Sequence, residues 1–86
     1  MKPIQFNEKA YTEFVEWADD DPGIFRKIDK LLRDIRRDPF KGLGKPEPLK
    51  HEWKGFWSRR ITDEHRMIYR FSNDVIYVAS LKDHYP

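Results

Sequence analysis

The second half of the chain contains three extended segments separated by only two or three residues. Residues 56–62, 65–71 and 75–81 are rich in aromatic and β-branched side chains, and short polar stretches lie between them. Connections this short join strands as hairpins, so successive strands run antiparallel. A further short strand around residues 49–52 is expected to join them. This half therefore predicts a twisted, mainly antiparallel sheet.

The first half predicts a short strand followed by two amphipathic helices. Residues 1–6 place two apolar side chains on one face, as a strand does. Asn7 is a favourable N-cap for the first helix, and Asp21 with Pro22 supplies a cap and a first-turn proline for the second. Pro39 ends the second helix, because its ring disfavours helical backbone at the residue before it. The apolar stripes comprise Ala10, Phe14 and Trp17 in the first helix, and Ile24 or Phe25, Ile28, Leu31, Leu32 and Ile35 in the second.

Together these elements predict a single α+β domain over residues 1–86, with the N-terminal strand in the sheet and the two-helix hairpin packed on one face. The chain has no cysteine, which excludes disulfides and thiolate metal sites. It also lacks an apolar stretch typical of a signal peptide or a membrane span. We therefore expect a cytoplasmic protein without a membrane partner.

Charge is distributed unevenly along the chain. The net charge is +2, but residues 1–21 carry six carboxylates and two lysines, whereas the rest carries fifteen lysines and arginines and nine carboxylates. A basic segment of this kind creates a local field that attracts a polyanion. The pattern slightly favours a nucleic-acid partner, although a solvated face that keeps a small domain soluble would have the same composition.

Glu47 is flanked by two prolines and is followed closely by arginines and histidines. Cleavage of RNA without a metal requires a base for the ribose 2′-OH proton, a cation for the phosphorane charge and an acid for the leaving 5′-oxygen. Glu47 is the candidate base, since the prolines fix its backbone; the alternative is a stiff surface connector. His84 is the candidate acid, because imidazole titrates near neutral pH, although histidines near a terminus are often frayed. Tyr85 could stack on a base, donate a proton or anchor the last strand.

The lysines and arginines of this region are candidate phosphate contacts. Strand alternation can place Arg60 and Arg66 on one side of adjacent strands, where two guanidinium groups would form a phosphate clamp. The alternative is that these charges only protect strand edges from aggregation. His51 and His65 are rival acids or bases. The complete set of candidate cations is Lys45, Lys50, Lys54, Arg59, Arg60, Arg66 and Arg70.

The histidines and carboxylates of the chain do not follow a metal-ligand spacing such as HExxH. Dinucleotide, P-loop and nucleophile-elbow motifs are absent too. We therefore expect no metal site and no cofactor. The residues alone predict an RNA-binding α+β domain whose composition suits a metal-independent nuclease.

Several uncommon residue runs occur in a fixed order. They are RRDPF at 36–40, GKPEPLKH at 44–51, GFWSRRIT at 55–62, EHR at 64–66 and HY at 84–85. With these runs the chain resembles the YoeB family of bacterial toxins, within the RelE-like superfamily, over its whole length. The resemblance implies a microbial-ribonuclease-like fold and a ribosome-dependent mRNA interferase that cleaves messages in the A site of the 70S ribosome. It also implies a cognate antitoxin of the YefM/Phd type.

The resemblance also implies roles for individual residues. Glu47 corresponds to the general base, Arg66 to the phosphate-stabilising arginine and His84 to the general acid. Tyr85 corresponds to the terminal tyrosine that helps to organise the site and the mRNA. The supporting basic positions near the scissile phosphate are Lys50 and Arg60.

Pro86 follows Tyr85, whereas members of this family commonly stop at the tyrosine. We expect a modest effect on activity, since His84 and Tyr85 are retained. The main alternative is a binding module that grips RNA or an antitoxin but has weakened chemistry. A DNA-binding regulator is disfavoured, because the chain has no recognisable helix-turn-helix. Monomer and homodimer are both compatible with the sequence.

Overall fold

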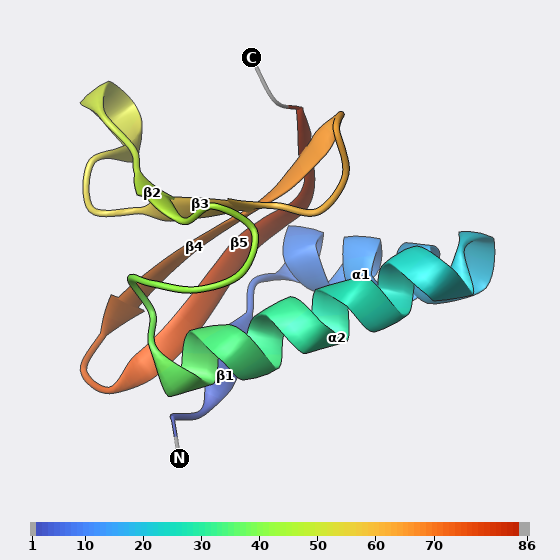
Figure 1. Cartoon of the computed structure of the whole chain (residues 1–86), viewed down its shortest axis with the longest axis horizontal. Coiled ribbons are helices and arrows are strands. Elements are labelled where there is room, and N and C mark those ends of the chain that lie inside the picture. The colour runs from blue at the N-terminus through green and yellow to red at the C-terminus, as the bar shows by residue number, and fades with distance from the viewer. Residues whose placement is uncertain (1, 85–86) are drawn as a thin grey trace.

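In the computed structural model, which describes residues 2–84, five strands form one sheet in the order β1-β5-β4-β3-β2. The three segments predicted as hairpins are β3 (Trp57–Arg60), β4 (His65–Ser72) and β5 (Val75–His84), and each pairs antiparallel with the next. The N-terminal strand β1 (Ile4–Phe6) runs parallel to β5 at one edge. The predicted, mainly antiparallel sheet is thus confirmed (Figure 1).

Two helices, α1 (Glu8–Asp20) and α2 (Pro22–Arg37), follow β1 and form the predicted hairpin. Both begin at the caps expected from the sequence. The Asn7 side chain accepts a hydrogen bond from a first-turn backbone N–H at 2.7 Å, and the Asp21 side chain accepts two, at 3.1 and 3.2 Å. The second helix stops two residues before Pro39, as the proline rule predicts.

The helices cover one face of the sheet, and the core lies between the two layers (Figure 1). Burial of the two apolar stripes against the strands supplies the main driving force for this arrangement. No helix within residues 2–84 is long and apolar enough to cross a membrane. The buried core comprises Ala10 and Trp17 from α1, Ile28, Leu31, Leu32 and Ile35 from α2, and Ile61, Met67, Tyr69, Ile76, Val78 and Leu81 from the second half.

The strand expected around residues 49–52 lies two residues earlier, so that prediction was wrong in position. β2 consists of Glu47–Pro48 and pairs with β3, whereas His51–Trp53 form a single 3₁₀ turn. His51 has φ of 59°, in the left-handed region that a strand does not use. Gly55, with φ of 96°, then returns the chain to β3. As a consequence, Glu47 itself belongs to the sheet.

The register of β3 and β4 places Arg60 directly opposite Arg66. Cross-strand partners project from the same face, so the predicted common side of these two arginines is confirmed. The next pair along, Arg59 with Met67, projects from the other face and is fully buried beneath the helices. The face of the sheet away from the helices therefore carries Arg60 and Arg66.

Candidate functional site

Glu47 and Arg66 are in contact on the face of the sheet away from the helices. Arg66 Nη1 donates to Glu47 Oε1 at 3.3 Å and lies 3.3 Å from Ser58 Oγ. Ser58 is the register partner of Glu47, so strand pairing itself sets the position of the carboxylate. The Arg66 side chain is 11% exposed and the Glu47 side chain 50% exposed. A guanidinium held by the sheet thus lies beside an accessible carboxylate.

A cavity of about 500 Å³ opens beside Arg66. Its walls include Lys50 and Trp53, from the turn after β2, and Asp83, from β5. Trp53 is an exposed large aromatic residue and Lys50 is an exposed cation. Unpaired RNA bases stack on aromatic rings while cations contact the phosphates, so this cavity has the chemistry needed for a nucleotide. The structure therefore places Lys50 in the same cavity as Arg66.

His84 is placed apart from that pair. It lies at the end of β5 directly opposite His65, with the imidazole centroids 5.4 Å apart, and its Nδ1 is 3.9 Å from Glu64 Oε2. Its neighbour Asp83 is the register partner of Arg66, and successive strand residues project from opposite faces. The His84 imidazole consequently faces the helix side of the sheet, and Arg66 faces away from it. Tyr85 and Pro86 lie outside the described residues.

Arg59 was predicted as an RNA contact, and this prediction was wrong. Its side chain is fully buried and donates to Asp34 Oδ2 at 2.6 Å and to Tyr69 Oη at 3.1 Å. Strand alternation gives the reason, because Arg59 shares the core side of β3 with Trp57 and Ile61. This signal was already visible in the sequence. Arg59 also donates to three loop carbonyls, those of Asp38, Lys41 and Leu43.

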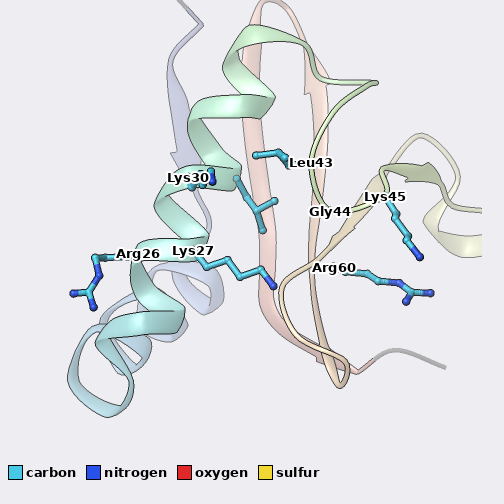
Figure 2. Close-up of a pocket in the computed structure, with 8 residues that line it drawn as sticks. Arg26, Lys27, Lys30, Leu43, Gly44, Lys45 and Arg60 are labelled. Carbon is cyan, nitrogen blue, oxygen red and sulfur yellow. The ribbon is translucent and has the colours of Figure 1, made fainter.

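Lys45 and Arg60 line a second depression, here called the cationic groove, which has a volume of about 580 Å³. Its opposite wall is α2, from which Lys27 extends toward the strands (Figure 2). The helix cations were not singled out as site residues from the sequence. The signal that could have found them is the spacing of residues 26, 27 and 30, which places them on neighbouring positions of one helix surface. The lysines and arginines that line the groove are Arg26, Lys27, Lys30, Lys45 and Arg60, and the charged ends of Lys45 and Arg60 point away from α2 (Figure 2).

The sequence runs that carry the candidate site also match a known family. A model of that family, the YoeB-like toxin of bacterial type II toxin-antitoxin systems, matches residues 6–85. The chain belongs to the YoeB family. It is 47% identical over 85 residues to Toxin YoeB of Escherichia coli K12, which covers 99% of this chain and 100% of that protein. Toxin YoeB of Streptomyces coelicolor is 44% identical over 82 residues, covering 95% of this chain and 98% of that one.

Solved YoeB structures share the fold closely. The YoeB/ParE toxin from Agrobacterium tumefaciens superposes with a TM-score of 0.93 at 40% identity, covering 96% of this chain and 99% of that one. YoeB in the YoeB-YefM complex from Staphylococcus aureus gives 0.90 at 36% identity, covering 99% of each chain. The predicted α+β fold of the YoeB type is confirmed, and the protein is a toxin of a type II toxin-antitoxin system.

Proposed function

We propose that this toxin is a ribosome-dependent endoribonuclease that cleaves mRNA in the A site by metal-independent acid–base chemistry. The observation that carries the proposal is the Glu47–Arg66 contact of 3.3 Å beside a nucleotide-sized cavity. Glu47 takes the proton of the ribose 2′-OH, and the 2′-oxygen attacks phosphorus in line. Arg66 stabilises the negative charge of the phosphorane. The bond from phosphorus to the 5′-oxygen then breaks.

The last step of this reaction needs a proton for the departing 5′-oxygen. His84 is the donor in our proposal, and the products are a 2′,3′-cyclic phosphate and a free 5′-hydroxyl. This role requires the His84 side chain to turn from the helix side of the sheet to the side of Arg66. The His84 side chain is 74% exposed at the end of β5, so this movement breaks little packing. RNA bound beside Arg66 would favour the turned position.

The dependence on the ribosome follows from how sparse the site is. The accessible Glu47 carboxylate and a movable imidazole do little to align a flexible RNA for in-line attack. In well-oriented systems, pre-positioning of the reacting groups lowers the activation free energy by about 7–11 kcal/mol. A ribosome that holds the message extended in the A site supplies that alignment. Lys50, Lys45 and Arg60 would provide the phosphate contacts around it.

We also propose that the toxin has an antitoxin partner of the YefM/Phd type. The S. aureus YoeB structure that shares this fold is a complex with YefM, and a further S. aureus structure is a YoeB dimer. The dimer superposes with a TM-score of 0.91 at 38% identity. A homodimer is therefore a second candidate assembly for the free toxin.

A binding module with weakened chemistry is the second candidate function. The position of His84, on the opposite side of the sheet from Arg66, is the observation that favours it. Such a module would occupy the A site through its cations and stop translation without cutting the message. It differs from the enzyme in leaving ribosome-bound mRNA intact.

Primer extension on a defined mRNA, with and without purified ribosomes, distinguishes the two candidates. The enzyme predicts cuts within the A-site codon that need ribosomes, are lost in Glu47→Gln, and persist in the control Glu8→Gln. Glu8 is an exposed carboxylate in the first turn of α1. Absence of cuts from a folded, ribosome-bound wild-type protein would instead establish the binding module.

A further inference from the structure

Glu64, His65 and His84 form a cluster at one end of the sheet that the proposed reaction uses only in part. Each residue contributes one potential ligand atom, a carboxylate oxygen or an imidazole nitrogen, and these atoms all lie within 4.8 Å of one another. His84 Nδ1 is 3.9 Å from Glu64 Oε2. The sequence predicted no metal site because the two histidines are far apart along the chain. Only the pairing of β4 with β5 brings them together.

The fold fixes the backbone that carries this cluster. His65 and His84 are direct register partners, so their side chains project from the same face. The Trp17 ring of α1 packs edge-on against the His65 imidazole, with centroids 5.2 Å apart. Thr62 Oγ1 accepts hydrogen bonds from Glu64 N at 3.1 Å and His65 N at 2.9 Å, which fixes the turn before β4. The sheet therefore fixes the backbone of His65 and His84, and the turn before β4 fixes the backbone of Glu64.

We propose that Glu64, His65 and His84 bind one Zn²⁺ ion. Two imidazoles and one carboxylate are a known zinc ligand set, with bonds of about 2.0–2.2 Å and water in the fourth position. Ligand atoms around such a tetrahedral ion lie about 3.3 Å apart, so no pair in the cluster has to close by more than about 1.5 Å. The side chains of Glu64 and His84 are 67% and 74% exposed, and rotation about their side-chain bonds displaces little packing.

The charge around the cluster is compatible with a cation. Glu64 supplies one negative charge directly. Lys82, two residues before His84, directs its ammonium group to Glu16 at 3.1 Å and lies over the Trp17 ring at 5.0 Å. Its charge is therefore neutralised on the α1 side. Arg66 projects from the opposite face of the sheet.

Zinc at this site would inhibit the toxin, an extension that rests on the proposed function. The ion would occupy a ring nitrogen of His84, so the imidazole could no longer deliver its proton. It would also hold His84 against His65, on the helix side of the sheet and away from Arg66. The ion thus opposes the reaction by removing the acid and by fixing its position. No step of the cleavage itself passes through the metal.

Isothermal titration calorimetry of the purified toxin with ZnCl₂ tests the site without reference to activity. We expect one Zn²⁺ per chain, with binding weakened at least about tenfold in His65→Gln and in Glu64→Gln. The matched control is His51→Gln, because His51 is an exposed histidine in the turn after β2, outside the cluster. It should bind zinc as tightly as the wild type. Equal affinity of wild type and His65→Gln, one Zn²⁺ shared by two chains, or no binding would each overturn the proposal.

The inhibitory effect is tested in the ribosome assay. Zinc at saturating concentration should slow wild-type cleavage at least about tenfold, and Glu64→Gln should need correspondingly more zinc for the same effect. A zinc-selective chelator should restore the rate. If zinc binds but cleavage continues unchanged, the regulatory role is wrong while the site stands. If the toxin cleaves nothing even without zinc, the proposed enzymatic function fails and the calorimetric result is unaffected.

Discussion

Arg59 donates to Asp34 at 2.6 Å beneath the loop that connects α2 to β2, and this buried pair joins the two layers of the fold. The Arg59 side chain has no exposed surface and the Asp34 side chain is 13% exposed. Three loop carbonyls and the Tyr69 hydroxyl accept the remaining hydrogen bonds of the guanidinium. Tyr69 in turn donates to Pro39 O at 2.6 Å. The loop that leads to Glu47 is thus organised around one cation.

Replacement of Arg59 by Leu should strongly destabilise the toxin. Removing one partner of a buried ion pair typically costs about 3–5 kcal/mol, and Arg59→Leu also takes the donor from three loop carbonyls. The control is Arg33→Ala, whose side chain is 74% exposed and pairs with Asp29 one helical turn away. That exposed pair is worth at most about 1 kcal/mol. Guanidinium chloride unfolding measures both, and similar losses for the two variants would contradict the assigned role of Arg59.

Acid should destabilise the fold in part through Glu13. Burial alone would raise the pKa of this carboxyl, but the Leu81 backbone N–H, at 2.7 Å, and the Lys9 ammonium, at 3.1 Å, outweigh it. The folded-state pKa therefore lies below the ordinary value of 4.5. The stabilisation is complete above that value and is lost as the pH falls through the folded-state pKa.

Glu13→Gln should consequently flatten the acid limb of the stability profile. The amide oxygen can still accept from Leu81 N, yet it has no proton to gain. Unfolding midpoints measured from about pH 6 to about pH 3 should fall less steeply for the variant than for the wild type. Parallel curves for the two proteins would show that Glu13 does not contribute to the acid sensitivity.

Gly44 and Gly55 offer a matched pair of substitutions. Both have positive φ, 76° and 96° respectively, so an alanine at either position costs about 1–2 kcal/mol in backbone strain. At Gly44 the added Cβ would also lie 3.0 Å from Arg60 O and from Leu31 Cδ2, whereas at Gly55 it meets nothing within 4 Å. Gly44→Ala should therefore lose about 1–3 kcal/mol more than Gly55→Ala in chemical unfolding. Equal losses of unfolding free energy would show that the contacts with Arg60 O and Leu31 Cδ2 relax without a measurable cost.

Ribosome binding by the toxin should weaken steeply with salt if its cations contact RNA phosphates. Each phosphate contact contributes about 0.7–0.9 to the slope of log affinity against log salt. Lys45→Ala and Lys50→Ala, which remove exposed cations of the two cavities, should each reduce the slope by about that amount. Arg33→Ala, paired with Asp29 on α2, should leave it unchanged. Sedimentation of ribosomes at several salt concentrations measures the slopes, and a flat response in the wild type would exclude a phosphate-contacting surface.

The helices and the hairpins could be predicted because their signals are local. Asn7 and Asp21 cap the helices through backbone groups two or three residues away, so their roles can be read from the sequence. The position of β2 could not be found this way. His51 has left-handed backbone, which a strand over residues 49–52 could not contain. A histidine does not by itself indicate that conformation, so the sequence could not show where the strand ends.

Strand alternation predicted that Arg60 and Arg66 share a face and that Arg59 lies on the core side, whereas arrangements that depend on long-range packing were missed. The contact of Glu47 with Arg66 joins two residues that the sequence singled out separately. The cationic groove forms because α2 lies against the loop before β2, an arrangement with no local signature. His84 was predicted to be the acid of the same reaction, but the pairing of β5 with β4 aligns Asp83 with Arg66 instead.

The pairing of β1 with β5 makes completion of this fold a late event in synthesis. Asn7 donates to Ala79 O across 72 residues of sequence, and Trp17 donates to Leu81 O across 64. Until β5 has been made, β1 and α1 lack these partners, and β4 has only β3 to pair with. Contacts between such distant residues also slow folding. A ribosome that is translating this toxin has therefore read almost the whole described chain before the Glu47–Arg66 surface becomes stable. The toxin consequently reaches its stable fold only near the end of its own synthesis.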